Sequence, residues 1–225
     1  MSIAKNIAAL RAALPAGVTL VAVSKTRPAD DVMEAWRAGQ LDFGENRPQE
    51  MAAKQAALAA LPSPPVGIRW HQIGHLQTNK VRLIIPFVAM IHSVDSARLA
   101  CEISRRAVEA GRVVDVLLEI LVAREESKEG WAWDELLAWL DGGQCRSLAG
   151  VRFRGVMGVA TFTDDESMVR AEFEALAAMH AELRERFFGA QFDTLSMGMS
   201  DDYPLALDAG STMVRIGSMI FGRRF

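Results

Sequence analysis

Short apolar runs recur along the whole chain, and each one ends in polar or small residues. Runs of this length predict buried β-strands, and eight of them can be counted. They cover residues 18–24, 41–46, 68–74, 87–94, 114–122, 153–160, 194–199 and 213–219. Between them, segments such as 29–39, 96–111 and 166–187 carry apolar residues three or four positions apart, which is typical of amphipathic helices. The chain therefore alternates strand and helix from end to end.

This alternation predicts the fold class, an α/β barrel. A strand, a helix and the next strand form a crossover unit with parallel strands, and eight such units in 225 residues favour a single (β/α)8 TIM barrel. The helical spacing of residues 1–14 adds an extra N-terminal helix before the first strand. No glycine-rich dinucleotide fingerprint or Walker-type loop follows a strand, which disfavours an open doubly wound sheet. We expect one domain over residues 1–225.

Net charge and composition narrow the possible partners. The formal net charge is −3, which leaves no excess of cations to bind a nucleic acid or an anionic membrane surface. No apolar stretch reaches the ~20 residues of a membrane span. The two cysteines, Cys101 and Cys145, lie far apart and outside any metal-binding or redox motif. We therefore expect buried free thiols in a reducing compartment, the cytoplasm.

Lys25 stands at the end of the first predicted strand, in the sequence LVAVSKT. The reactive groups of TIM barrels lie at the carboxyl ends of the strands. An amine held there against an apolar strand is partly desolvated, which favours its neutral, nucleophilic form and makes Lys25 a candidate for a Schiff base with a carbonyl. The alternative is a lysine whose stem covers the rim of the barrel while its ammonium group reaches water. The position of Lys25 alone leaves both open.

The last two predicted strands end in residues suited to an anion. Ser200 follows a flexible glycine and precedes a predicted helix start, and Gly217 and Ser218 stand at the end of the eighth strand. Hydroxyls and free backbone amides at such turns bind phosphate, and barrel phosphate sites favour the last two strands. Alternatively, Ser200 only caps a helix. The rim would then carry an amine that can react with an aldehyde and a binding site for phosphate. Pyridoxal phosphate (PLP), a phosphorylated aldehyde, fits both.

His71 and His75 have the spacing of a zinc-binding pair on a helix. They fall on a strand and its exit, where four residues span about 13 Å, so we expect no metal site. His75 is expected at the rim of the barrel. His71 is expected to be either a hydrogen-bonded core histidine or a neighbour of a bound ring.

The same segments carry a resemblance that covers nearly the whole chain. The motifs AVSKTRP, DFGENRPQE, WHQIGHLQTNK, IHSVDS, EESKEG, FRGVMGVATF and LSMGMSDDYPLALDAGSTMVRIGSMIFG occur in this order. In these motifs the chain resembles the pyridoxal phosphate homeostasis protein family. The resemblance implies a barrel like the N-terminal domain of alanine racemases, PLP as the cofactor, and a role in vitamin B6 homeostasis.

The resemblance also implies roles for individual residues. Lys25 corresponds to the lysine that forms the Schiff base with PLP, and Asn46 to an asparagine suited to bind the edge of the ring. Arg215 matches the racemase-like arginine that faces the ring nitrogen, and its alternative is an inward-pointing residue paired with an acid. The residues implied to hold the phosphate are Ser200, Gly217 and Ser218.

The resemblance favours a carrier or regulator of PLP without efficient turnover. Racemases of this fold take a tyrosine from a further C-terminal domain as second base, whereas the one tyrosine here, Tyr203, lies next to the predicted phosphate site. We therefore name no catalytic residue. A PLP-dependent, racemase-like enzyme for amino acids is the second possibility, and a barrel aldolase that uses Lys25 on a phosphorylated sugar is a third. We expect a monomer whose partners are PLP and PLP-dependent apo-enzymes.

Overall fold

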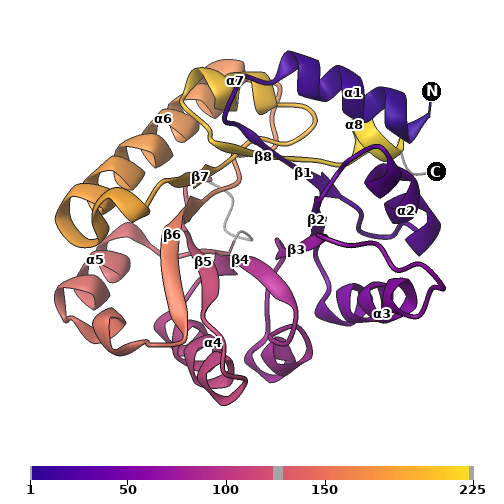
Figure 1. Ribbon diagram of the computed structural model, residues 1–225. Coiled ribbons are helices and arrows are strands. Elements are labelled where there is room, and N and C mark those ends of the chain that lie inside the picture. Colours follow the sequence, from indigo (N-terminus) through magenta and orange to yellow (C-terminus); the bar gives the residue numbers. More distant parts are fainter. Residues whose placement is uncertain (1, 124–128, 223–225) are drawn as a thin grey trace.

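Eight parallel strands form a closed barrel in the computed structural model, which describes residues 2–123 and 129–222 (Figure 1). Each strand is hydrogen-bonded to the next, and β8 closes the ring by pairing with β1, with Val21 opposite Arg215. The strands are β1 (Thr19–Val23), β2 (Asp42–Glu45), β3 (Arg69–Gln72), β4 (Val88–Val94), β5 (Val114–Glu119), β6 (Val151–Met157), β7 (Thr194–Ser196) and β8 (Met213–Ile216). The predicted TIM barrel is confirmed, and each strand overlaps one of the predicted apolar runs.

Helices surround the barrel and connect its strands (Figure 1). They are α1 (Ile3–Ala13), α2 (Ala29–Arg37), α3 (Pro48–Ala59), α4 (Ala97–Glu109), α5 (Trp133–Asp141), α6 (Glu166–Leu183), α7 (Tyr203–Asp208) and α8 (Ser218–Phe221). The extra helix α1 precedes β1, as predicted, and lies beside α8, where the Asn6 side chain donates a hydrogen bond to the Ile220 carbonyl (2.9 Å). The connection from β3 to β4 contains a short 3₁₀ helix, Thr78–Leu83, in place of an α-helix.

The strands form where apolar residues run together, because both faces of a barrel strand are covered. In β1, the three central residues Leu20, Val21 and Ala22 are all buried. On the outer face of the sheet, Trp70 of β3 donates its indole N–H to Gln55 of α3 (2.6 Å) and is almost completely buried. A large part of the apolar core therefore lies between the sheet and the ring of helices, and the carboxyl ends of the strands remain available for a site.

The two cysteines differ from the sequence expectation. Both are free, but Cys101 is exposed and Cys145 is only partly buried, so the prediction of buried thiols is wrong. Cys101 follows Ala100, which belongs to the buried face of the amphipathic helix α4, and the next position along a helix points about 100° away from that face. None of the helices in the described ranges combines the length and the apolarity that a membrane span requires.

Candidate functional site

A cavity of about 630 Å³ opens at the carboxyl ends of the strands. This volume lies within the range of small-molecule sites, roughly 300–1,000 Å³. All six residues that the sequence assigned to a cofactor line it, although they come from four different strand ends. The lining residues are Val23, Lys25, Arg27, Asn46, Ile73, Val159, Met199, Ser200, Asp201, Arg215, Gly217, Ser218 and Gly222.

Lys25 follows the end of β1 by two residues, and its partly buried side chain lines the cavity. The backbone turns sharply just beyond it, because Thr26 adopts a left-handed conformation with φ of 63°. A residue other than glycine holds such a conformation only where its surroundings enforce it. The Glu50 carboxylate accepts a hydrogen bond from the Thr26 backbone N–H (2.5 Å) and thereby fixes this turn.

A buried ion cluster supports the turn from α3. The Lys54 ammonium donates to the Ser24 carbonyl (2.7 Å) and contacts carboxylate oxygens of Glu45 (2.6 Å) and Glu50 (2.8 Å). Burial raises the pKa of Glu45, and hydrogen bonds from Lys54 and Ser24 offset only part of that effect. The cluster therefore ties α3 to the ends of β1 and β2, next to Lys25.

Ser200 and Gly217 meet at the far ends of β7 and β8. The Gly217 backbone N–H donates to the Ser200 hydroxyl (3.4 Å), and Ser218 begins α8. A Cβ atom on residue 217 would lie 3.2 Å from the Val23 carbonyl oxygen, so glycine lets the β8 turn approach β1 closely. The helix-capping alternative for Ser200 is wrong, because α7 begins only at Tyr203 and Asp202 occupies its N-cap position.

Asn46 enters the cavity from the end of β2, and two neighbours define its place. Gln72 donates from its side-chain amide to the carbonyls of Asn46 and Gly74 (both 2.8 Å), which joins the loops after β2 and β3. A Cβ atom on residue 74 would lie only 2.9 Å from the Asn46 side chain. Gly74 therefore leaves the space that Asn46 occupies.

Arg215 is buried at the base of the cavity, with only 4% of its surface exposed. One guanidinium nitrogen donates to the carbonyl (2.8 Å) and hydroxyl (2.7 Å) of Ser196, and the other donates to the Gly158 carbonyl (3.0 Å). Within the described chain these partners are neutral oxygens, in contrast to the direct acid partner that the alternative interpretation required. Burial lowers the pKa of Arg215 to about 10, so the guanidinium stays charged at neutral pH.

Sequence reasoning did not identify two charged residues of the cavity, Arg27 and Asp201. Arg27 donates to the Gly222 carbonyl and so links the β1 turn to the segment after α8. Its presence in the motif AVSKTRP, two positions after Lys25, was the available signal. Among the described lining residues, three are cationic and Asp201 is the one acid, which leaves the cavity with an excess of positive charge suited to a phosphate.

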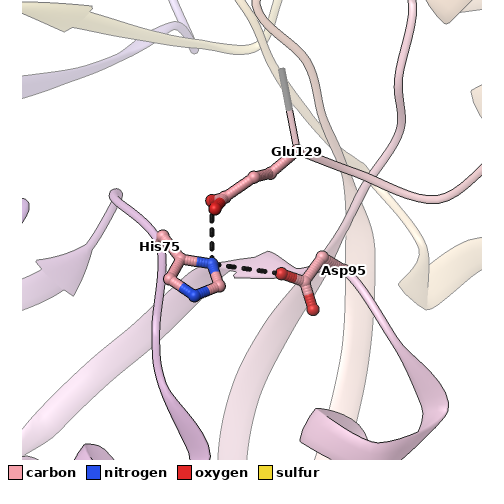
Figure 2. Close-up of side chains that lie close together, drawn as sticks. All are labelled: His75, Asp95 and Glu129. Atoms are coloured by element: carbon pink, nitrogen blue, oxygen red, sulfur yellow. Dashed lines mark ion pairs between the residues drawn. The ribbon is translucent and has the colours of Figure 1, made fainter. Parts of the chain in front are cut away.

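A second polar group lies on the rim at the ends of β3 to β5 (Figure 2). The His75 Nδ1 atom is 2.8 Å from a Glu129 oxygen and 3.3 Å from an Asp95 oxygen. The three donor atoms lie within 4.8 Å of one another, a spacing that a divalent cation could bridge, and the same contacts form an ion pair when His75 is protonated. His75 is at the rim, as predicted. The neighbouring motif EESKEG lies mostly outside the described residues.

His71 lies inside the barrel and not in a metal pair with His75. It is 3% exposed, its Nε2 contacts Asp42 (3.0 Å), and its Nδ1 contacts Nε2 of His92 (2.9 Å). This placement agrees with the expectation of a hydrogen-bonded core histidine. Sequence reasoning did not predict its partners, because His92 and Asp42 lie on other strands.

Comparisons with known proteins agree over nearly the whole chain. The family described as alanine racemase, N-terminal domain, matches residues 1–224. A pyridoxal phosphate homeostasis protein of Pseudomonas aeruginosa is 39% identical, with 99% of this chain and 96% of that protein covered. The protein of the same name from Escherichia coli is 39% identical over 93% of this chain and 87% of its own length.

Solved structures extend these similarities to the fold. The structure of PipY from Synechococcus elongatus, with PLP bound, is similar with a TM-score of 0.88 and 40% identity, covering 98% of this chain and 100% of PipY. Alanine racemase from Streptomyces lavendulae has a TM-score of 0.79 at 20% identity. The match covers 99% of this chain and 57% of the racemase, and at this identity it shows a shared fold.

Proposed function

This chain belongs to the pyridoxal phosphate homeostasis protein family, within the broader alanine racemase N-terminal domain family, and from that premise we propose that it binds PLP reversibly through Lys25. It would act in intracellular vitamin B6 homeostasis as a carrier or regulator that exchanges PLP with apo-enzymes. The observation that carries the proposal is the convergence of Lys25, Ser200 and Gly217 on one cavity.

The residues of the cavity suit each part of PLP. Its phosphate requires cations, hydroxyls and amides, which Arg27, Ser200 and the turn at Gly217 supply. Its ring requires apolar walls, which Val23 and Ile73 supply. Gly217 lets the β8 turn approach Val23 of β1 closely, and a side chain at residue 217 would force the two apart where both line the cavity. The donor set therefore fits this cofactor.

Bound PLP would supply an aldehyde that condenses reversibly with a primary amine, and among the described residues that line the cavity Lys25 is the one that carries such an amine. Asn46, which lines the same cavity, would bind the edge of the ring. Arg215 would donate to the ring nitrogen, and a guanidinium, which cannot accept a proton, would disfavour protonation of that nitrogen. The chain would thereby hold the cofactor in a form that withdraws electrons weakly.

Weak electron withdrawal and the position of the single tyrosine support a binding role over efficient turnover. Tyr203 begins α7 and is not among the described residues that line the cavity. A proton donor on the second face of a substrate contributes roughly 10²–10⁴-fold to a rate. The second candidate, a racemase-like enzyme for amino acids, rests on the same Lys25 and on the shared barrel. The two free cysteines support a cytoplasmic protein, and we propose that it acts as a monomer.

Absorbance spectroscopy of the purified protein titrated with PLP tests the proposal. We expect a yellow absorption band from the Schiff base. Borohydride should reduce this linkage to a stable adduct, which peptide mass analysis should map to Lys25. Lys25→Ala should abolish the adduct, while Lys5→Ala, on the exposed surface of α1, should retain it. A wild-type protein that stays colourless with excess PLP would contradict the proposal. Rapid racemisation of D- or L-amino acids by the yellow protein would favour the second candidate.

A further inference from the structure

Five buried polar side chains form a continuous hydrogen-bonded chain across the interior of the barrel. They belong to β8, β7, β4, β3 and β2, and each is at most 8% exposed. In order, the chain contains Arg215, Ser196, His92, His71 and Asp42. Only Arg215 lines the cavity, so the other four lie behind it.

Each link of this chain is a hydrogen bond of ordinary length. A guanidinium nitrogen of Arg215 lies 2.7 Å from the Ser196 hydroxyl, which lies 3.1 Å from Nδ1 of His92. Nε2 of His92 lies 2.9 Å from Nδ1 of His71, and Nε2 of His71 lies 3.0 Å from an Asp42 carboxylate oxygen. The two imidazole rings meet edge to face, with centroids 5.1 Å apart.

With both imidazole rings neutral, the two ends fix the direction of every hydrogen bond between them. Arg215 has only donors, and an ionised Asp42 has only acceptors. Burial by itself would raise the pKa of Asp42, but hydrogen bonds from His71 and from Arg69 lower it, so the carboxylate is ionised at neutral pH. The Ser196 hydroxyl therefore accepts from Arg215 and donates to His92, which donates onward to His71, which donates to Asp42.

The same direction assigns the protons on both imidazoles. Nε2 of His71 donates to Asp42, so its Nδ1 is free to accept, and Nε2 of His92 donates to it. Nδ1 of His92 then accepts from Ser196. Burial lowers the pKa of His92 well below its usual value, which agrees with a neutral ring.

We propose that Ser196 and His92 are positioning residues that hold the Arg215 guanidinium in place in the cofactor cavity, with His71 and Asp42 fixing the direction of their hydrogen bonds. This inference deepens the proposed function and rests on it. The buried Ser196 hydroxyl that accepts from Arg215 also has a hydrogen to donate, and His92 is the acceptor that holds the hydroxyl in this orientation. Removal of either side chain would leave the other with an unsatisfied buried group.

Nuclear magnetic resonance of the cofactor-free protein tests the hydrogen-bond chain without reference to PLP. The protein has four histidines. Variants His75→Asn and His180→Asn identify the signals of the rim and α6 histidines, and the remaining two signals belong to His71 and His92. Long-range correlation of ¹⁵N-labelled histidine at neutral pH should show both His71 and His92 neutral, with the proton on Nε2. A proton on Nδ1 of either His71 or His92 would overturn the proposed direction.

Cofactor binding tests the positioning role. Ser196→Ala and His92→Phe should each shift the absorption band of bound PLP and weaken its affinity roughly tenfold, the effect of one lost buried hydrogen bond to a charged group. The double variant should lose no more than either single one, because both changes break the same link. Ser196→Thr, which keeps the hydroxyl, should restore the wild-type band.

The outcomes separate this inference from the proposed function. A wild-type protein that fails to bind PLP contradicts the proposed function. The proton positions on His71 and His92, measured by NMR, still test whether the five side chains form the hydrogen-bonded series. The positioning role would be overturned if the wild type binds PLP and the folded variants Ser196→Ala and His92→Phe bind it with the same affinity and the same spectrum. Circular dichroism verifies the fold of each variant, and additive losses in the double variant would also contradict the proposal.

Discussion

Glu119 ends β5 with one carboxylate oxygen buried and without a hydrogen-bond partner in the part of the chain that the structure describes. Burial and the charges of Asp95 and Glu129 raise the pKa of Glu119, the charge of Arg215 lowers it, and the net result is a pKa of about 8. A carboxyl group in such surroundings is protonated at neutral pH. At neutral pH the folded protein therefore binds this proton, whereas the unfolded chain does not.

This raised pKa predicts how stability depends on pH. The unfolded chain loses the Glu119 proton near pH 4.5, whereas the folded protein keeps it up to about pH 8. The stability contributed by this group is complete below pH 4.5 and decreases as the pH rises to about 8, by at most about 1.4 kcal/mol per pH unit. Glu119→Gln should remove that slope from urea-unfolding free energies of the cofactor-free protein. Exposed Glu174→Gln is the control, and an unchanged slope in Glu119→Gln would contradict the assignment.

Gly217 is the residue at which a single added methyl group should reach the site. Its Cβ would lie 3.2 Å from the Val23 carbonyl oxygen and 3.3 Å from the Val23 side chain, so the β8 turn must shift by a few tenths of an ångström. Gly217→Ala should therefore weaken PLP binding roughly tenfold, or about 1.4 kcal/mol, in an equilibrium titration. Gly142→Ala, at the end of α5, should bind as the wild type does. Equal affinities for all three proteins would exclude this role for the close approach.

Among the elements, α3 determines the position of the β1 turn. Its buried residue Lys54 forms an ion pair with Glu45 at the end of β2, and the Glu45 side chain is fully buried. Lys54→Met leaves the Glu45 charge buried and unpaired, which typically costs about 3–5 kcal/mol. We expect a loss of this size in the free energy of unfolding measured with urea, against almost none for Lys5→Met on exposed α1.

Removal of the buried charge itself is the matched experiment for this cluster. In Lys54→Met/Glu45→Gln neither the buried cation nor the fully buried carboxylate remains, although Glu50 does, so the double variant should recover part of the stability that Lys54→Met loses. Borohydride trapping of PLP on Lys25 should weaken in both variants, because the turn after β1 loses its support from α3. A double variant as unstable as Lys54→Met would show that the ion pair is not the source of the loss.

At the scale of the whole molecule, closure of the barrel makes the strands depend on one another. Each strand pairs with two neighbours, and β1 pairs with β8 although they lie at opposite ends of the chain. Loss of one strand therefore opens the ring and exposes both adjacent edges. We predict one cooperative thermal transition in scanning calorimetry, as expected for a single domain over residues 1–225. Two well-separated transitions would contradict this prediction.

Closure also explains which parts of the site the sequence could predict. Lys25, Asn46, Ser200 and Gly217 stand at strand ends, and the carboxyl ends of barrel strands share one face, so their general placement followed from their position along the chain. The hydrogen-bonded series that begins at Arg215 did not follow, because it depends on strand register and on side chains from four other strands. The position of Arg27 in the cavity depends on the left-handed turn at Thr26. The sequence does not predict this turn, because neither glycine nor asparagine stands there.

The sequence by itself determined the alternation of strands and helices, the closed barrel and the rim on which the reactive residues lie, because apolar periodicity and chain length are local or additive properties. Tertiary structure decided which rim residues share a cavity. It placed β8 beside β1, so that Gly217 packs against Val23 next to the turn that carries Lys25. It also turned Asp42, His71, His92 and Ser196 into one hydrogen-bonded chain, because only the folded register brings donors and acceptors from distant strands within bonding distance.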